Sequence, residues 1–100
     1  MSMKTIKTTK EVTLKDGTLI PKGSYIDYVG PSLMETVGIF QVGSRELKLR
    51  YRSVLKSPSV NTLQKWEENG YCNTVFGERT EPDGFGPDHE PSWMLALGMI

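Results

Sequence analysis

The sequence predicts a small, mainly β protein that contains one short helix. Runs rich in Thr, Val, Ile, Leu and Tyr recur through the first half of the chain, and turns with Gly or Pro separate them about every 8–12 residues. This spacing is typical of antiparallel sheets with hairpin connections. The length of 100 residues indicates a single domain. We therefore expect a small antiparallel barrel or bent sheet, followed by a helix and an irregular C-terminal segment.

The β part is expected to cover residues 4–56. Residues 5–14 hold four Thr together with Val12 and Ile6, and they predict the first strand. Asp16 and Gly17 follow at once, and this pair predicts a tight hairpin because both residue types tolerate positive φ. The returning strand is then expected over residues 18–20.

Three further strands are expected over residues 24–29, 36–42 and 45–55. Gly43 lies between the last two and predicts a short turn. Gly38 interrupts an otherwise β-branched and aromatic run, which is typical of a β-bulge.

The strand expected over residues 45–55 would have one apolar and one basic face, because side chains alternate along a strand. Two residues of strand span about 6.8 Å, which is close to phosphate spacing along a single nucleic-acid strand. Tyr25, Tyr28 and Phe40 are the aromatic rings that could stack on bases. The alternative is a solvated outer face whose charges prevent aggregation. The residues of this nucleic-acid-binding hypothesis are Arg45, Lys48, Arg50, Arg52 and Lys56.

One helix is expected over residues 60–69. Asn61 or Ser59 would cap its N-terminus, and Gly70 would supply the left-handed residue at its end. Because the helix is short, we expect it to be stabilised by docking its Trp66 side on the sheet.

Residues 72–100 are expected to form an irregular segment that packs over the sheet. Residues 72–76 are a candidate edge strand, whereas the prolines and glycines of residues 78–91 exclude a helix or a central strand. Residues 92–100 are almost uncharged, and Ser92 would cap one helical turn there. This apolar end predicts either core or a contact with a partner, including a second copy of the chain.

Two stretches of the C-terminal segment stand out, Gly-Glu-Arg-Thr-Glu-Pro-Asp-Gly at residues 77–84 and Pro-Ser-Trp-Met-Leu-Ala-Leu-Gly at residues 91–98. An Asp/Gly loop that precedes such an apolar end resembles small uncharacterised proteins of tailed bacteriophages. The resemblance implies a phage or prophage origin and a protein acting in the bacterial cytoplasm, and it implies no activity, cofactor or functional residue. Residues 12–23, Val-Thr-Leu-Lys-Asp-Gly-Thr-Leu-Ile-Pro-Lys-Gly, are similar to the opening hairpin of small SH3-like barrels.

The formal net charge is zero, but the charge is unevenly distributed along the chain. Residues 1–60 hold ten Lys or Arg and five Asp or Glu, whereas residues 61–100 hold two and seven. Such a division predicts either a bipolar molecule or two halves that pack together and neutralise each other.

The acidic C-terminal part is the second candidate site. Its carboxylates would suit a basic protein partner, while the ligand spacing of a calcium loop is absent. Phe85 and the apolar end would supply the hydrophobic part of the contact. The alternative is an ordered but functionally silent loop in which Phe85 is tucked in as the anchor. The partner-binding residues of this hypothesis are Glu78, Glu81, Asp83, Phe85, Asp88 and Trp93.

An enzyme is not expected. Cys72 and His89 are the only candidate nucleophile and base, and two such residues make neither a zinc site nor a catalytic dyad without spatial proximity. We expect no metal and no cofactor. One cysteine, a polar start and no membrane-length apolar run predict a cytoplasmic location.

The leading hypothesis is therefore a phage-type accessory protein that binds a host or phage protein through its C-terminal third. The alternative is a nucleic-acid-binding barrel that uses the basic strand face. A small enzyme that uses Cys72 and His89 is the remote third.

Overall fold

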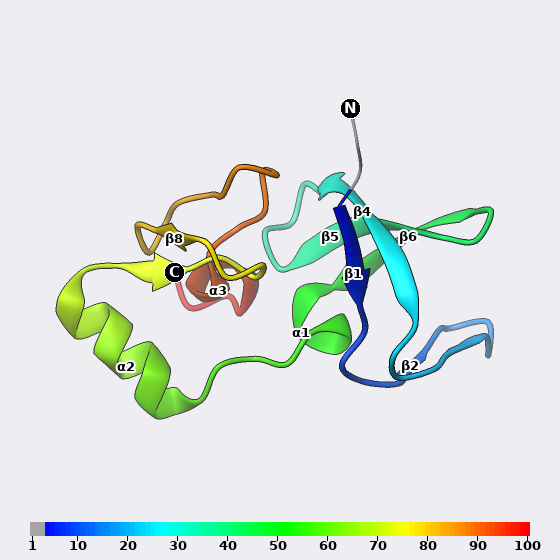
Figure 1. Cartoon of the computed structure of the whole chain (residues 1–100), viewed down its shortest axis with the longest axis horizontal. Coiled ribbons are helices and arrows are strands. Elements are labelled where there is room, and N and C mark those ends of the chain that lie inside the picture. Colours follow the sequence, from blue (N-terminus) through cyan, green and yellow to red (C-terminus); the bar gives the residue numbers. More distant parts are fainter. Residues whose placement is uncertain (1–3) are drawn as a thin grey trace.

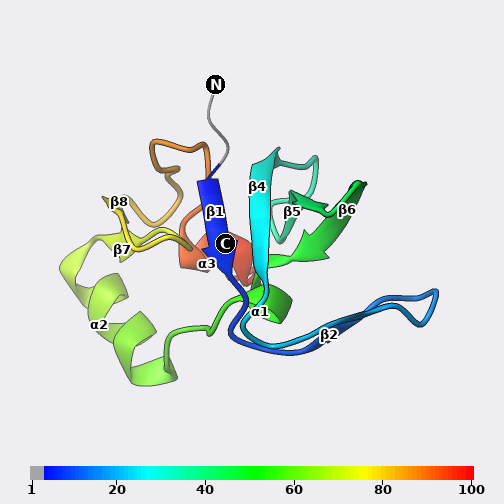
Figure 2. The same cartoon turned by 45° about the vertical axis from the view of Figure 1, so that its right-hand side comes forward.

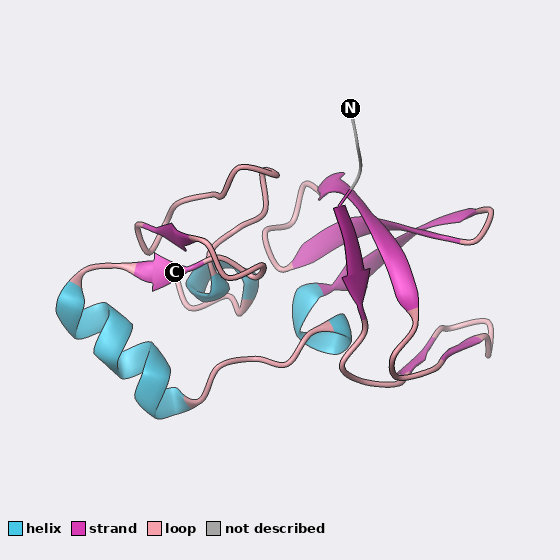
Figure 3. Cartoon of the chain, in the orientation of Figure 1, coloured by secondary structure: helices cyan, strands magenta, loops and turns pink. Residues whose placement is uncertain are grey.

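The computed structural model describes residues 4–100, whose three principal dimensions are 41, 29 and 22 Å (Figure 1). Residues 1–3, the start of the polar N-terminal stretch, lie outside the described residues. A four-stranded antiparallel sheet and two small hairpins dominate the described chain and confirm the mainly β class (Figure 3). Across residues 4–100, no helix is long and apolar enough to cross a membrane.

The central sheet has the strand order β1-β4-β5-β6, with every neighbour antiparallel. Its edge strands β1 and β6 are not paired with each other, so the described sheet is open and bent rather than a closed barrel (Figure 2). Side chains alternate as expected, and one face buries Ile26, Tyr28, Phe40 and Leu49. The strands are β1 (Lys4–Lys7), β4 (Tyr25–Pro31), β5 (Val37–Val42) and β6 (Arg45–Arg50).

The β-bulge lies in β4, where the register shifts between Tyr28 and Gly30. The expectation of a bulge at Gly38 is therefore wrong. A Cβ atom at Gly38 would lie 2.8 Å from the ring of Tyr51, so this position needs glycine for the close approach of that ring.

The strand expected over residues 45–55 is also too long, because β6 ends at Arg50 and the chain continues as α1 (Tyr51–Val54). Its partner β5 begins at Val37, which pairs with Arg50, and the N–H of Val37 donates to the carbonyl of Met34 in a turn (3.0 Å). No β5 residue remains to extend the ladder, so the chain turns inward and buries Tyr51 completely.

The first expected strand is divided in two. The chain leaves the sheet at Thr8, whose buried hydroxyl donates to the carbonyl of Pro21 (2.9 Å). It then forms a hairpin of β2 (Val12–Thr13) and β3 (Leu19–Ile20) around Gly17, which has a φ of 88° as the Asp-Gly pair predicts. Figure 2 shows this hairpin projecting from the body of the protein.

The expected helix is present as α2 (Val60–Asn69), and Gly70 ends it with a φ of 74°. Its cap is Ser59 rather than Asn61, because the Ser59 hydroxyl accepts the N–H of Thr62 (3.2 Å). The main contact of α2 with another element is with β7, and Trp66 packs against the core that the sheet shares with the C-terminal segment (Figure 1).

The C-terminal segment contains a hairpin of β7 (Cys72–Asn73) and β8 (Arg79–Thr80), followed by α3 (Trp93–Ala96). As expected, Ser92 caps α3, and its hydroxyl accepts the N–H of Leu95 (3.2 Å). All four residues of α3 are buried, so the apolar end is mainly core.

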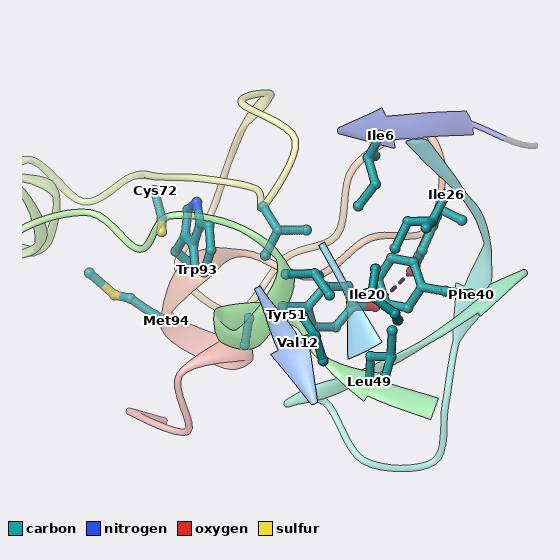
Figure 4. Close-up of a cluster of buried hydrophobic side chains, with 14 of the residues drawn as sticks. Ile6, Val12, Ile20, Ile26, Phe40, Leu49, Tyr51, Cys72, Trp93 and Met94 are labelled. Atoms are coloured by element: carbon teal, nitrogen blue, oxygen red, sulfur yellow. Dashed lines mark hydrogen bonds between the residues drawn. The ribbon is translucent and has the colours of Figure 1, made fainter. Parts of the chain in front are cut away.

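The core joins the sheet to the C-terminal segment. Buried side chains from the sheet, from the β2–β3 hairpin and from α1 meet those of β7 and α3 in one cluster (Figure 4). The hydroxyl groups of Tyr28 and Tyr51 hydrogen-bond to each other inside it (2.8 Å), and both rings pack on Phe40. The two halves of the chain therefore share one core.

Candidate binding surfaces

The first candidate surface is the acidic segment, defined here as residues 77–91. It carries five carboxylates and one guanidinium, and every carboxylate except that of Glu90 belongs to an exposed residue. The side chain of Phe85 lies in the middle of the segment and is 50% exposed. An aromatic ring is thus displayed among negative charges.

The buried carboxylate of Glu90 holds the acidic segment in place. One of its oxygens accepts the hydroxyl of Thr74 (2.8 Å) and the other accepts the backbone N–H of Asp88 (2.9 Å). Glu90 lies close against Gly86, where any Cβ atom would collide with the carboxylate. The Glu90 carbonyl also accepts the N–H of Gly86 (2.8 Å). Glu90 is therefore a structural residue and is not available to a partner.

Further backbone hydrogen bonds order both ends of the segment. The N–H of Gly84 donates to the carbonyl of Glu81 (2.9 Å), and the N–H of Ser92 donates to the carbonyl of Gly84 (3.0 Å). His89 has a φ of 62° and donates its N–H to the carbonyl of Gly86 (3.0 Å). Despite its prolines and glycines, the segment has a defined shape, which reduces the entropy lost on binding.

Five of the six predicted partner-binding residues lie exposed on this segment. The exception is Trp93, which lies in α3, is only 6% exposed and belongs to the core. Its assignment to a partner contact is corrected accordingly. The exposed predicted residues are Glu78, Glu81, Asp83, Phe85 and Asp88.

The predicted nucleic-acid-binding residues do not share one face. Lys48 and Arg50 lie on the solvent side of β6, but Arg45 points to the opposite side and pairs with Asp16 (3.1 Å). Arg52 lies in α1, because β6 has already ended. Exposed Lys56 follows in the link to α2.

The aromatic rings of that hypothesis are not placed for base stacking either. Tyr28 and Phe40 are buried in the core, and only Tyr25 is exposed, with the ammonium group of Lys7 5.9 Å from its ring centroid. Arg50 and Arg52 do line a hollow of about 200 Å³, together with residues 36, 96 and 97. The basic residues thus form a small pair rather than a continuous groove.

A second candidate surface was not predicted from the sequence. It is a hollow of about 210 Å³ between the β2–β3 hairpin and the central sheet, called the hairpin groove here. The sequence feature that could have indicated this groove is the pair Leu14 and Leu19, one on each arm of the hairpin. Each strand of the hairpin has only two residues, so the hairpin is too small to bury these side chains itself. The apolar residues that line the groove are Leu14, Leu19, Ile20, Pro21, Tyr25, Ile26, Val42 and Leu47.

The two oppositely charged parts of the chain occupy different ends of the molecule. The strands of the basic N-terminal part lie at one end of the long axis, and α2, β7 and β8 lie at the other (Figure 1). Within residues 4–100, the only ion pair is Arg45–Asp16, and both partners belong to the basic part. No ion pair between described residues joins the parts.

Among the described residues, no hydrogen bond joins Cys72 to His89. The thiol of Cys72 is buried and donates to the carbonyl of Asn73 (3.2 Å), whereas His89 is exposed on the acidic segment. No three His, Cys, Asp or Glu side chains in residues 4–100 are grouped as a metal site would require.

Relatives with known properties would provide independent information on these surfaces. Comparison of the chain with protein-family models, with curated proteins and with solved structures finds no match. The phage origin and the SH3-like comparison therefore stay predictions, and the function has to be argued from the surfaces themselves.

Proposed function

We propose that this chain is a non-catalytic accessory protein that binds a basic protein surface through the acidic segment, with Phe85 as the central contact. The observation that carries the proposal is the half-exposed ring of Phe85 on an ordered loop among carboxylates. Interfaces commonly combine one aromatic anchor with charged residues around it, which contribute orientation and association rate. A phage-encoded accessory role in the bacterial cytoplasm, as the resemblance implies, is compatible with this activity.

The same segment has features that favour binding over a purely structural role. Its fold is maintained by Glu90, Thr74 and Ser92, none of which is exposed, while Phe85 and its acidic neighbours make none of the segment's side-chain hydrogen bonds. The exposed residues are therefore not required for the loop's shape. Binding, rather than stability, gives them a role.

Affinity capture tests this proposal. The full-length chain is immobilised at low salt and exposed to a lysate of bacteria that also express a tagged copy of it, so that every protein partner is available. The variants are Phe85→Ala and Glu81→Lys/Asp83→Lys, with Val60→Ala as the control, because Val60 is an exposed apolar residue (68%) on α2. Removal of residues 77–100 would be uninformative, because α3 belongs to the core.

We expect the wild type and Val60→Ala to retain a protein that both loop variants lose and that higher salt releases. Equal retention by all four proteins, or retention of none, would contradict the proposal. Salt-sensitive retention of single-stranded DNA that survives Phe85→Ala and disappears on Lys48/Arg50/Arg52→Ala would replace it with the nucleic-acid function.

A further inference from the structure

The hairpin groove and the acidic segment are complementary surfaces that lie at different ends of the same molecule. We infer that the partner of the acidic segment is a second copy of this chain, in which the hairpin groove receives Phe85. This inference rests on the proposed function, since it names the partner of the same surface.

The groove has the size and lining that an aromatic side chain requires. Its volume of about 210 Å³ is below the roughly 300–1,000 Å³ of most small-molecule pockets, and it suits one inserted ring. Ile20 and Ile26 are buried at its base, and Leu19 (49% exposed) and Tyr25 (72% exposed) remain open to solvent. Covering these side chains would remove apolar surface from water on both copies.

The charges around the groove are opposite to those around Phe85. An adjoining hollow of about 380 Å³ shares Leu14, Arg45 and Leu47 with the groove and brings two lysines to the same site. The linings of the two hollows hold three cationic residues, Lys15, Arg45 and Lys48, and a single carboxylate, that of Asp16, with Lys48 on the solvent side of edge strand β6. Phe85, in contrast, has three exposed acidic residues within four positions of it in the sequence, Glu81, Asp83 and Asp88. Docking the ring in the groove would therefore bring unlike charges together at the rim, which favours correct orientation and fast association.

Geometry makes this contact intermolecular. The acidic segment lies above the C-terminal half of the molecule, while the β2–β3 hairpin projects at the far side, and the two views agree on this separation (Figures 1 and 2). Hydrogen bonds from Thr74 and Asp88 hold the segment in place through Glu90. Each copy therefore carries the acidic segment with Phe85 on one side and the open hairpin groove on the other. Such head-to-tail contacts generate rings or open chains rather than symmetric dimers.

Sedimentation velocity on the purified full-length chain tests the inference at low and high salt over a range of concentrations. Leu19→Glu adds a carboxylate to the groove, and Phe85→Ala removes the ring. Val60→Glu makes the same kind of change at an exposed apolar residue of α2 and serves as the control. Tyr25→Ala is the second groove variant, should Leu19→Glu alter the circular dichroism spectrum.

We expect the average mass of the wild type and of Val60→Glu to rise with concentration beyond that of a dimer, and to fall with salt. Phe85→Ala and each groove variant should weaken this association at least about tenfold. An equimolar mixture of Phe85→Ala with a groove variant should form dimers and nothing larger, because only one complementary pair of surfaces remains.

A wild type that stays monomeric at every concentration and salt would overturn the inference, as would a mixture that forms no dimer. Failure of the inference can be separated from failure of the proposed function. A monomeric wild type that still captures another protein in a Phe85-dependent way leaves the proposed function in place. Assembly and capture that are both unaffected by Phe85→Ala would refute both.

Discussion

At the scale of single residues, Glu90 is the side chain on which the acidic segment depends. It is an acidic residue in the sequence, yet its burial and its two hydrogen-bond donors, Thr74 and Asp88, give it a different role from that of its exposed neighbours. Buried polar groups with satisfied hydrogen bonds specify one arrangement of the chain around them. The exposed carboxylates can therefore serve binding while Glu90 maintains the loop.

Replacement of Glu90 tests this division of roles. Glu90→Ala would leave the Thr74 hydroxyl and the Asp88 N–H without an acceptor and would open a cavity, so we expect a loss of about 3 kcal/mol in the free energy of unfolding. Glu90→Gln should cost less, because it keeps the volume and one acceptor oxygen. Urea denaturation measures the change, and Glu78→Ala, at an exposed position, should stay within about 0.5 kcal/mol of the wild type. Equal losses in Glu90→Ala and Glu78→Ala would exclude a structural role for Glu90.

The buried Tyr28–Tyr51 pair makes the free energy of unfolding depend on pH in the alkaline range. Burial raises the pKa of Tyr28 to about 12, against a usual value of 10, and burial raises the pKa of Tyr51 as well. Because the folded state holds the Tyr28 proton more tightly than the unfolded state does, the contribution of Tyr28 to stability is complete below about pH 10 and is lost as pH rises through about 12.

Tyr28→Phe should accordingly reduce this pH dependence. We expect the variant to be about 1 kcal/mol less stable than the wild type near pH 9, since Tyr51 loses its hydrogen-bond partner. Between about pH 9 and pH 12, its free energy of unfolding should fall less than that of the wild type. Urea titrations at the two pH values make the comparison, and parallel decreases in both proteins would show that the pair does not control alkaline unfolding.

At the scale of elements, the turn from β6 into α1 links the sheet to the C-terminal half. α1 places the Tyr51 ring against Gly38 of β5, where a side chain would occupy the same space. The same ring reaches the hydroxyl of Tyr28 in β4. Through Tyr51, α1 thus connects two strands of the sheet within the shared core (Figure 4).

Gly38→Ala tests this packing of β5 against α1. The added methyl group would lie within 2.8 Å of the buried Tyr51 ring, which has little space to move, so we expect a loss of about 1–3 kcal/mol in the free energy of unfolding. Gly30→Ala is the matched control in the same sheet, because nothing lies within 4 Å of its Cβ position. Thermal unfolding followed by circular dichroism gives both values, and similar losses at Gly38 and Gly30 would argue against a tight contact with the ring.

At the scale of the whole molecule, one core holds together two parts of opposite charge. The core residues come from both parts, although the strands of the basic part and the elements α2, β7 and β8 lie at different ends of the long axis. A molecule whose acidic segment and hairpin groove are joined by one core is suited to the head-to-tail contact inferred above, because the core fixes the orientation of the two surfaces relative to each other.

The sequence by itself determined the mainly β class, the Asp16-Gly17 hairpin, α2 with its end at Gly70, and the exposed carboxylates around Phe85. These features depend on local chemistry: side-chain periodicity, residues that tolerate positive φ, and helix capping. The tertiary structure alone decided where β6 ends, that Arg45 pairs with Asp16, and that Trp93 and Glu90 are buried. It alone also formed the hairpin groove from strands distant in sequence. Such features depend on which segments pack together, and a local residue pattern does not indicate which distant segment of the chain will pack against it.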